Sequence, residues 1–270
     1  MRFSICNEIF SGWKLEETFA YASQLGYDGV EIAPFTLADS VLDISAQDRR
    51  AIRDSARRHG ITVAGLHWLL VKPEGLSVNH SDPKTRQRTA DYLCALVDFC
   101  ADVGGHRMVF GSPKQRNVLA GVTAAQAEVW ALETFASPLA QAAKRDVTLC
   151  FEPLGAAETN FVNTAAEAIR FVQRAQSAHF RIVLDVKAMS TEAKPIPEII
   201  RASWPHFAHF HANDPNRKGP GFGAVDFRPI ATALKEVGYG GFVSVEVFDL
   251  EEGPEAIASR SLDYLRKVFA

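Results

Sequence analysis

The amino-acid sequence predicts a single (β/α)8 TIM barrel, in which eight parallel strands are each followed by a helix. Short apolar or β-branched runs alternate with longer amphipathic segments along the whole chain, which is the pattern of repeated strand–helix units. The length of 270 residues suits this fold, which typically needs about 250. No linker, low-complexity tract or charge block interrupts the alternation. We therefore expect residues 1–270 to form one domain.

The predicted strands are nearly continuous in apolar residues, as expected for a parallel sheet that is covered on its outer face. They comprise residues 3–7, 29–32, 61–67, 107–111, 147–152, 181–185, 207–211 and 242–248. The intervening segments carry apolar residues at three- and four-residue spacing and are predicted helices. They comprise residues 15–26, 46–60, 85–103, 123–144, 163–175, 196–202, 228–238 and 254–269. Gly26 and Gly60 stand where two of these helices are expected to end.

A doubly wound open sheet is the alternative fold. Such a sheet usually has fewer strands and a glycine-rich turn, GxGxxG, directly after its first strand. Here the first strand continues into NEIFSGWK, which contains no such turn. The alternation of eight strands with eight helices therefore favours the closed barrel.

The composition excludes several classes of partner. The formal net charge of −3 provides no positive field for a phosphate backbone, so we expect no binding to nucleic acid. No stretch approaches the ~18 uninterrupted apolar residues of a membrane span, and MRFSICNEIF lacks the apolar core of a signal peptide. The four cysteines form no CxxC pair and are expected to be reduced, mostly buried thiols. We expect a cytoplasmic protein without a membrane partner.

Polar side chains end most of the predicted strands, and in this fold chemistry takes place at the C-terminal strand ends. In chain order, the residues at the ends of strands two to eight are Glu31, His67, Gly111, Glu152, Asp185, His211 and Glu246. A single carboxylate at such a position is often a helix cap or half of a salt bridge. The last four, however, end neighbouring strands, so their side chains should converge on one region.

Three carboxylates and one imidazole that converge inside a barrel would be costly to desolvate, and a divalent cation satisfies all four. We therefore predict one metal ion bound by Glu152, Asp185, His211 and Glu246. The oxygen-rich set favours Mn²⁺, with Mg²⁺ and Co²⁺ as alternatives and Zn²⁺ still open. No cysteine lies at these strand ends.

Other side chains are candidates for the pocket around the ion. His67 is expected either to line it or to be structural. His209 lies two residues before His211 and points to the same side of its strand. We expect His209 to fill the barrel interior one layer below, with a hydrogen bond to a metal ligand as the alternative. Trp13, Phe35 and Trp68 follow the first three strands and could form an apolar wall, although simple packing is the more common role for such residues.

The second half of the chain resembles a known superfamily. The segments CFEPLGAAETNFVNT, VLDVKAM, HFHANDPNR, GPGFGAVDF and SVEVF, in this order and spacing, are similar to those of the xylose-isomerase-like barrels. Within that superfamily the chain most resembles the ketose 3-epimerases of the tagatose and psicose type and hydroxypyruvate isomerase. The motifs cover about residues 148–248. The first half agrees only in rhythm and in details such as YDGVEI.

The resemblance implies a metal-dependent sugar isomerase or epimerase that removes a proton through a metal-stabilised enediolate. It implies that Glu152 and Glu246 are metal ligands and also the acid/base pair, and that Glu158 and Arg217 contact substrate oxygens. It also suggests a small-molecule sugar substrate and a homo-oligomer, either a dimer or a tetramer.

The chain departs from the epimerase pattern at one position. Where those enzymes carry a histidine three residues after the aspartate, this chain has Ala188, with Lys187 beside it. A metal-dependent lyase that cleaves C-glycosides or keto-sugars therefore stays open as an alternative. An endonuclease acting at abasic sites is a further alternative in the same superfamily. Those enzymes carry additional histidines for a zinc cluster that this chain lacks at strand four and at residue 188.

Overall fold

The computed structural model describes all 270 residues, and its eight parallel strands close into a barrel in chain order. The strands are β1 (Arg2–Cys6), β2 (Gly29–Ile32), β3 (Thr62–Leu66), β4 (Arg107–Phe110), β5 (Thr148–Phe151), β6 (Phe180–Asp185), β7 (Phe207–Ala212) and β8 (Phe242–Val245). β1 pairs with both β2 and β8, which completes the closure. The predicted (β/α)8 barrel is confirmed.

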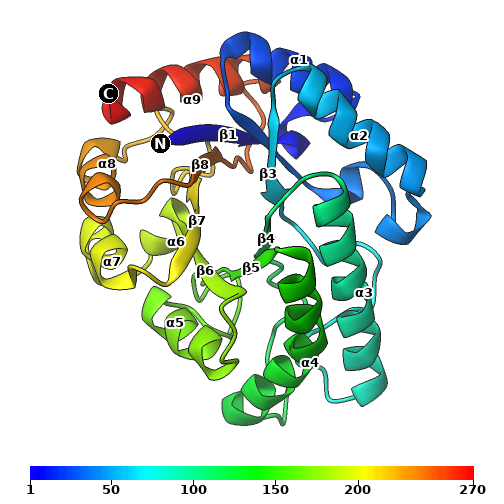
Figure 1. Ribbon diagram of the computed structural model, residues 1–270. Coiled ribbons are helices and arrows are strands. Elements are labelled where there is room, and N and C mark those ends of the chain that lie inside the picture. The colour runs from blue at the N-terminus through cyan, green and yellow to red at the C-terminus, as the bar shows by residue number, and fades with distance from the viewer.

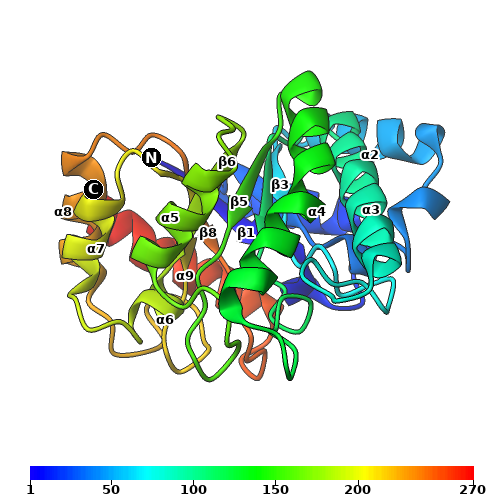
Figure 2. The ribbon, with the colours of Figure 1, turned by 90° about the horizontal axis from the view of Figure 1, so that it is seen from below.

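Helices surround the barrel in chain order, as the blue-to-red colouring of Figure 1 shows. They are α1 (Leu15–Leu25), α2 (Ala46–Arg58), α3 (Pro83–Asp102), α4 (Ala124–Arg145), α5 (Ala165–Arg174), α7 (Ile196–Ser203), α8 (Phe227–Glu236) and α9 (Pro254–Phe269). Short 3-10 helices, which the sequence did not predict, are η1 (Asn7–Phe10), η2 (Pro34–Thr36) and η3 (Val41–Asp43). The N-terminus lies beside the C-terminal helix α9 in Figures 1 and 2.

A ninth helix, α6 (Val186–Met189), was also not predicted. It is a single turn directly after β6, and its first residue follows Asp185. The side chain of Asp185 accepts a hydrogen bond from the backbone N–H of Ala188 at 2.7 Å, which caps the turn. The turn therefore depends on a carboxylate that belongs to the predicted metal site.

Local signals explain where the longer helices begin and end. Ser45, Asp82, Thr123 and Thr164 each accept a backbone N–H at a helix N-terminus, and Thr164 forms a capping box with Glu167. Gly26 ends α1 with a φ of 91°, a conformation that favours glycine, so the predicted stop is confirmed. No helix of the structure combines the length and apolar character needed to cross a membrane.

Phenylalanine side chains pack the barrel wall against α4 and α5. Five rings form this cluster, and none is more than 2% exposed: Phe110, Phe135, Phe151, Phe171 and Phe180. The centroids of neighbouring rings lie 4.8 to 6.3 Å apart. Burial of each such side chain contributes about 1.5 to 3 kcal/mol. This cluster lies directly behind the C-terminal ends of β4 and β5 and so holds them in a fixed position.

The C-terminal strand ends open toward the edge of the barrel where α6 lies, opposite the edge that holds the N-terminus (Figure 2). Strand eight is shorter than predicted and ends at Val245 instead of residue 248. The reason is that the N–H groups of Phe248 and Asp249 donate to the carbonyl of Arg217, at 2.9 and 3.0 Å, instead of extending the sheet. The loops after β7 and β8 are thereby joined at this mouth.

Candidate functional site

The four predicted metal ligands lie together at the mouth of the barrel. One ligand atom from each of Glu152, Asp185, His211 and Glu246 lies within 4.8 Å of the others. Asp185 and His211 are paired positions on β6 and β7, while Glu152 and Glu246 directly follow β5 and β8. All four side chains are buried, with at most 5% exposure of any residue.

Hydrogen bonds fix the orientation of Asp185. One carboxylate oxygen accepts from Ala188 N, and the other accepts from Asn213 Nδ2 at 2.5 Å. Asn213 in turn accepts from the backbone N–H of Lys187 at 2.8 Å. The chain segments after β6 and β7 therefore hold the carboxylate between them.

A buried carboxylate, Glu31, orients the imidazole of His211. His211 Nε2 lies 3.3 Å from both oxygens of Glu31, which leaves Nδ1 facing the cluster, 3.1 Å from Glu246 Oε2. Glu31 does not end β2 as predicted, because Ile32 follows it within the strand, and Glu31 is fully buried. Burial opposes its charge, yet His209 and His211 outweigh burial and hold the pKa of Glu31 well below its usual range.

His209 occupies the barrel interior, as expected, and it is also hydrogen-bonded. Its Nε2 lies 2.8 Å from Glu31 Oε2, and the residue is 1% exposed. Because Glu31 contacts both histidines, His209 supports the orientation of His211 through that carboxylate. His209 therefore has the expected interior position, and it supports a predicted ligand only indirectly, through Glu31.

His67 connects the cluster to a residue that the sequence did not single out. Its Nδ1 lies 3.4 Å from Glu246 Oε1, and its Nε2 lies 2.8 Å from Glu8 Oε2. Burial would lower the pKa of His67, but Glu8 and Glu246 raise it to about 10. Glu8 belongs to η1, directly after β1, so its position after a strand was the available signal.

The cluster fits a divalent cation. His211 Nδ1 and Glu246 Oε2 are buried and lie 3.1 Å apart, but neither atom forms a hydrogen bond of good geometry. Burial, followed by repulsion from Glu246 and Asp185, raises the pKa of Glu152 to about 8. Burial and Glu246 likewise raise the pKa of Asp185 to about 6. A bound cation would relieve this repulsion and use the unpartnered atoms, and three oxygens with one nitrogen suit a hard or borderline ion.

These pKa values predict that metal affinity rises with pH. Glu152 and Asp185 must be deprotonated to bind an ion, so protons compete with the metal below pH values of about 8 and 6. His211 must also lose a proton, because burial lowers its pKa but Glu246 and Glu31 raise it well above its usual value. We therefore expect the Kd for Mn²⁺ to fall about 10- to 100-fold per pH unit between pH 6 and 8. Isothermal titration calorimetry in buffers of different ionisation enthalpy should detect about one to two protons released per ion at pH 7. A Kd and a proton release that do not change over this range would contradict the assignment of these ligands.

A cavity of about 340 Å³ lies above the cluster, which is a suitable size for a small sugar. His67, Glu158 and Arg217, the three predicted substrate contacts, all line it together with Glu152 and Glu246. The structure thus brings every predicted site residue except the buried Asp185 and His211 to the wall of one cavity.

Gly111 explains why strand four lacks a polar end. It lines the cavity one residue beyond β4, and a Cβ atom at this position would overlap Glu152 Oε2. Gly111, the one strand end without a polar side chain, therefore leaves space for the carboxylate of Glu152, a predicted metal ligand.

Aromatic rings form one wall of the cavity. Trp68 and Phe248 both line it, with ring centroids 6.2 Å apart, and Phe35 packs on Trp68 from outside at 6.4 Å. Trp68 has a φ of 52°, an uncommon conformation for a bulky residue, and such conformations are concentrated at functional sites. Trp13 instead packs against Phe10 and Tyr21, so of the three aromatic residues considered for the wall only Trp68 lines the cavity.

Lys187 occupies the side of the cavity where the expected histidine is missing. Its ammonium contacts both oxygens of Glu158, at 2.7 and 2.8 Å, and lies 4.9 Å from the centroid of Phe248. Ala188 is buried, and its methyl side chain offers no polar group to the cavity. Arg217 lies over the same ring at 6.0 Å and has no side-chain hydrogen bond or ion pair within the chain. Cationic groups therefore lie at this wall, apart from the acidic cluster below.

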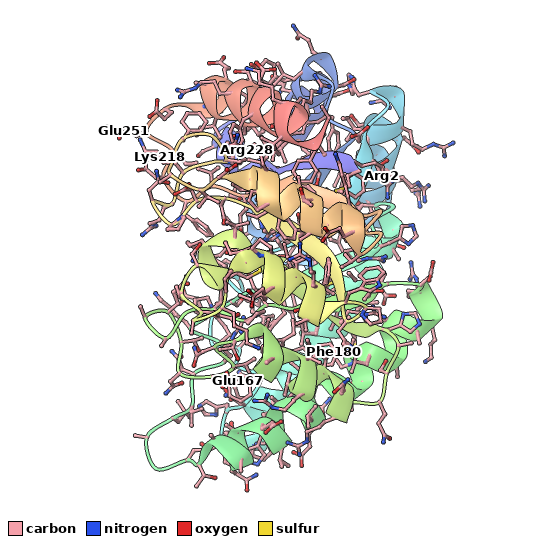
Figure 3. The ribbon with its side chains drawn as sticks, turned by 90° about the vertical axis from the view of Figure 1, so that its left-hand side faces the viewer. Arg2, Glu167, Phe180, Lys218, Arg228 and Glu251 are labelled. Atoms are coloured by element: carbon pink, nitrogen blue, oxygen red, sulfur yellow. The ribbon has the colours of Figure 1, made fainter.

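Ion pairs hold the loops at the rim of the mouth. Lys218 Nζ lies 3.5 Å from Glu251 and 2.9 Å from Glu252, so it joins the loop after β7 to the loop after β8. Figure 3 shows Lys218 and Glu251 together at one end of the molecule and Arg2 at the other. Such exposed pairs contribute little stability, about 0 to 1 kcal/mol, but they help to define the shape of the rim.

Comparisons with known proteins agree with the barrel fold. A family described as the xylose isomerase-like TIM barrel matches residues 19–268. A D-psicose 3-epimerase of Agrobacterium fabrum is 28% identical over 84% of this chain and 76% of its own length. An L-ribulose 3-epimerase of Mesorhizobium japonicum is 28% identical over 92% and 80%. The crystal structure of a D-psicose 3-epimerase from Clostridium cellulolyticum H10 with D-tagatose shares the fold. Its TM-score is 0.88, with 21% identity over 100% of this chain and 99% of that one.

Proposed function

The chain belongs to the xylose isomerase-like TIM barrel family, and we propose that it is a metal-dependent sugar epimerase or isomerase. The observation that carries the proposal is the pair of buried glutamates, Glu152 and Glu246, in a cluster that can hold one ion beneath a sugar-sized cavity. The names of the relatives, which are epimerases of psicose and ribulose, place the enzyme in the isomerase class. The substrate is a ketose or a related keto-sugar.

The reaction is a proton transfer beside a carbonyl group. A divalent ion held by Glu152, Asp185, His211 and Glu246 would polarise that carbonyl and stabilise the negative charge that develops beside it. One glutamate removes the C–H proton, which leaves an enediolate, and the other supplies a proton from the opposite face. Because the reaction is reversible, each carboxylate accepts a proton in one direction and donates it in the other.

Return of the proton to the same carbon from the opposite face inverts that centre. Return to the neighbouring carbon moves the carbonyl group by one carbon, which exchanges an aldose and a ketose when the two carbons are C1 and C2. Both glutamates line the cavity, so both reach its contents. The relatives named 3-epimerases favour inversion at a single carbon. We therefore propose epimerisation as the main reaction, with isomerisation as the variant outcome.

The cavity wall would hold the remainder of the sugar. Glu158, Arg217 and His67 contact hydroxyl and carbonyl oxygens, while Trp68 packs on an apolar face of the ring or chain. We further propose Mn²⁺ as the bound ion and a homodimer or homotetramer as the assembly. These details and a cytoplasmic location stay predictions.

The direct test is to incubate the Mn²⁺-loaded protein with D-fructose, D-tagatose, D-psicose, L-ribulose and a panel of aldoses and keto-sugars in D2O. NMR would follow deuterium at each carbon and identify the products. We expect deuterium at one carbon next to the carbonyl, together with formation of the epimer. An eliminated or cleaved product would establish the lyase alternative. Absence of exchange in every sugar would overturn the proposed function.

Lys187 is expected to contribute to substrate affinity more than to the rate of the chemical step. In Lys187→Met the ion pair to Glu158 is lost, so we expect KM to rise about 10- to 100-fold while kcat changes less than about threefold. Lys187→Arg should recover part of the affinity. Lys72→Met, which removes a surface ion pair to Glu74, is the control. A KM that is unchanged in Lys187→Met would show that this side chain takes no part in recognition.

A further inference from the structure

Arg116 is the largest fully buried side chain of the protein, with 0% exposure. It belongs to the segment GSPKQR, between β4 and α4, whose arginine the proposed reaction does not use. Its guanidinium packs against two neighbouring phenyl rings, 4.5 Å from the centroid of Phe151 and 5.1 Å from that of Phe110. The charge is therefore enclosed behind the C-terminal ends of β4 and β5.

The guanidinium is bound entirely by main-chain carbonyls. Nη1 donates to the carbonyl of Glu152, Nη2 to that of Phe110 at 3.0 Å, and Nε to that of Ser112 at 3.4 Å. No carboxylate forms an ion pair with it, in contrast to Arg145, which contacts two aspartates. A buried cation without a carboxylate partner is costly, so an arginine kept in this position requires another explanation.

The contact with Glu152 supplies that explanation. The carboxylate of Glu152 belongs to the metal cluster, and its carbonyl accepts a hydrogen bond from the Arg116 guanidinium. The same guanidinium holds the carbonyl of Phe110, the last residue of β4. Because the donors of a guanidinium point in fixed directions within one plane, they set the position of β5 relative to β4 at the point where the ligand emerges.

We propose that Arg116 is a positioning residue for Glu152, which fixes the main chain that carries this ligand and acid/base group. The inference rests on the proposed function. A displacement of about 1 Å at a reacting group can lower a rate about 100-fold, and loss of an outer partner typically weakens metal binding 10- to 100-fold. The recognition residues Glu158, Lys187 and Arg217 have no hydrogen bond to Arg116, so we expect substrate affinity to change less than metal affinity.

The test compares Arg116→Lys, which keeps the charge, with Arg116→Met, which removes it. Because lysine cannot reproduce the planar set of donors, both variants are expected to bind Mn²⁺ 10- to 100-fold more weakly by isothermal titration calorimetry. The paramagnetic resonance spectrum of the bound Mn²⁺ should change, and kcat should fall about 100-fold at a nearly constant KM. Arg86→Met is the matched control. Arg86 also contacts main-chain carbonyls and an aromatic ring, Trp130, but lies away from the cluster.

Each outcome decides a separate point. Failure of the wild-type protein to bind Mn²⁺ would defeat the proposed function. Wild-type affinity in both Arg116 variants would overturn the positioning role alone, and normal affinity in Arg116→Lys only would show that charge, not geometry, matters. If neither variant folds, Asn79→Ala replaces them, because Asn79 Nδ2 donates to the carbonyl of Arg116. An unchanged Mn²⁺ Kd in folded Asn79→Ala would then count against the proposal.

Discussion

Replacement of either glutamate by glutamine, as Glu152→Gln or Glu246→Gln, is expected to lower the rate of epimerisation about 10²- to 10⁴-fold. The amide preserves the shape of the side chain but cannot accept a proton, and it is a weaker ligand for a divalent ion. Both carboxylates line the cavity, Glu152 directly after β5 and Glu246 directly after β8. Because β6 and β7 lie between those strands, the two carboxylates approach a bound sugar from different sides.

The two variants should differ in a diagnostic way. If each glutamate serves one face of the reacting carbon, each variant retains slow C–H exchange with D2O in only one epimer, and the two variants retain it in opposite epimers. NMR of purified epimers measures this directly. Glu133→Gln, which alters an exposed carboxylate paired with Arg86, is the control and should behave as wild type. Loss of exchange from the same epimer in both variants would contradict the two-base arrangement.

Removal of the metal should have an equally large effect. We expect protein dialysed against a chelator to retain less than about 1% of its activity, because three mutually repelling carboxylates would then lack a counter-ion. Free Mn²⁺ at about 1000 times its Kd stabilises the folded state by about 4 kcal/mol, or roughly 10 °C in Tm. Calorimetry with and without Mn²⁺ measures the shift.

Asp185→Asn is the matched variant for this experiment. It keeps the shape of the side chain and an oxygen that can accept from Ala188 N, but it removes one charge from the cluster. The Mn²⁺-dependent rise in Tm should therefore be largely lost. Full activity in protein shown by elemental analysis to contain no metal would exclude this part of the proposal.

The fold could be predicted from the sequence because its signals are local and repeated. Each predicted strand overlaps an observed one, since buried parallel strands consist of short apolar runs and surface helices have a clear period. The convergence of Glu152, Asp185, His211 and Glu246 followed from the same pattern. Residues at the ends of neighbouring parallel strands must meet at one mouth, whatever the details of the loops.

The contacts that support the site could not be predicted in this way. Glu31 was identified only as a strand end, whereas its partners His209 and His211 lie across the barrel, 178 and 180 residues away in sequence. Glu8 faces His67 because η1 turns the chain after β1 toward β3. Likewise, Lys187 meets Glu158 and Arg116 meets Glu152 through loop paths that have no periodic signal.

The central claim is that one ion binds where these four strand ends meet, and anomalous diffraction from a crystal soaked in Mn²⁺ tests it most directly. We expect a single strong peak at about 2.0 to 2.4 Å from ligand atoms of Glu152, Asp185, His211 and Glu246. A second group, Cys6, Glu8 and His67, also has ligand atoms within 4.8 Å of one another. A peak at that group alone, or no peak within the barrel, would contradict the account.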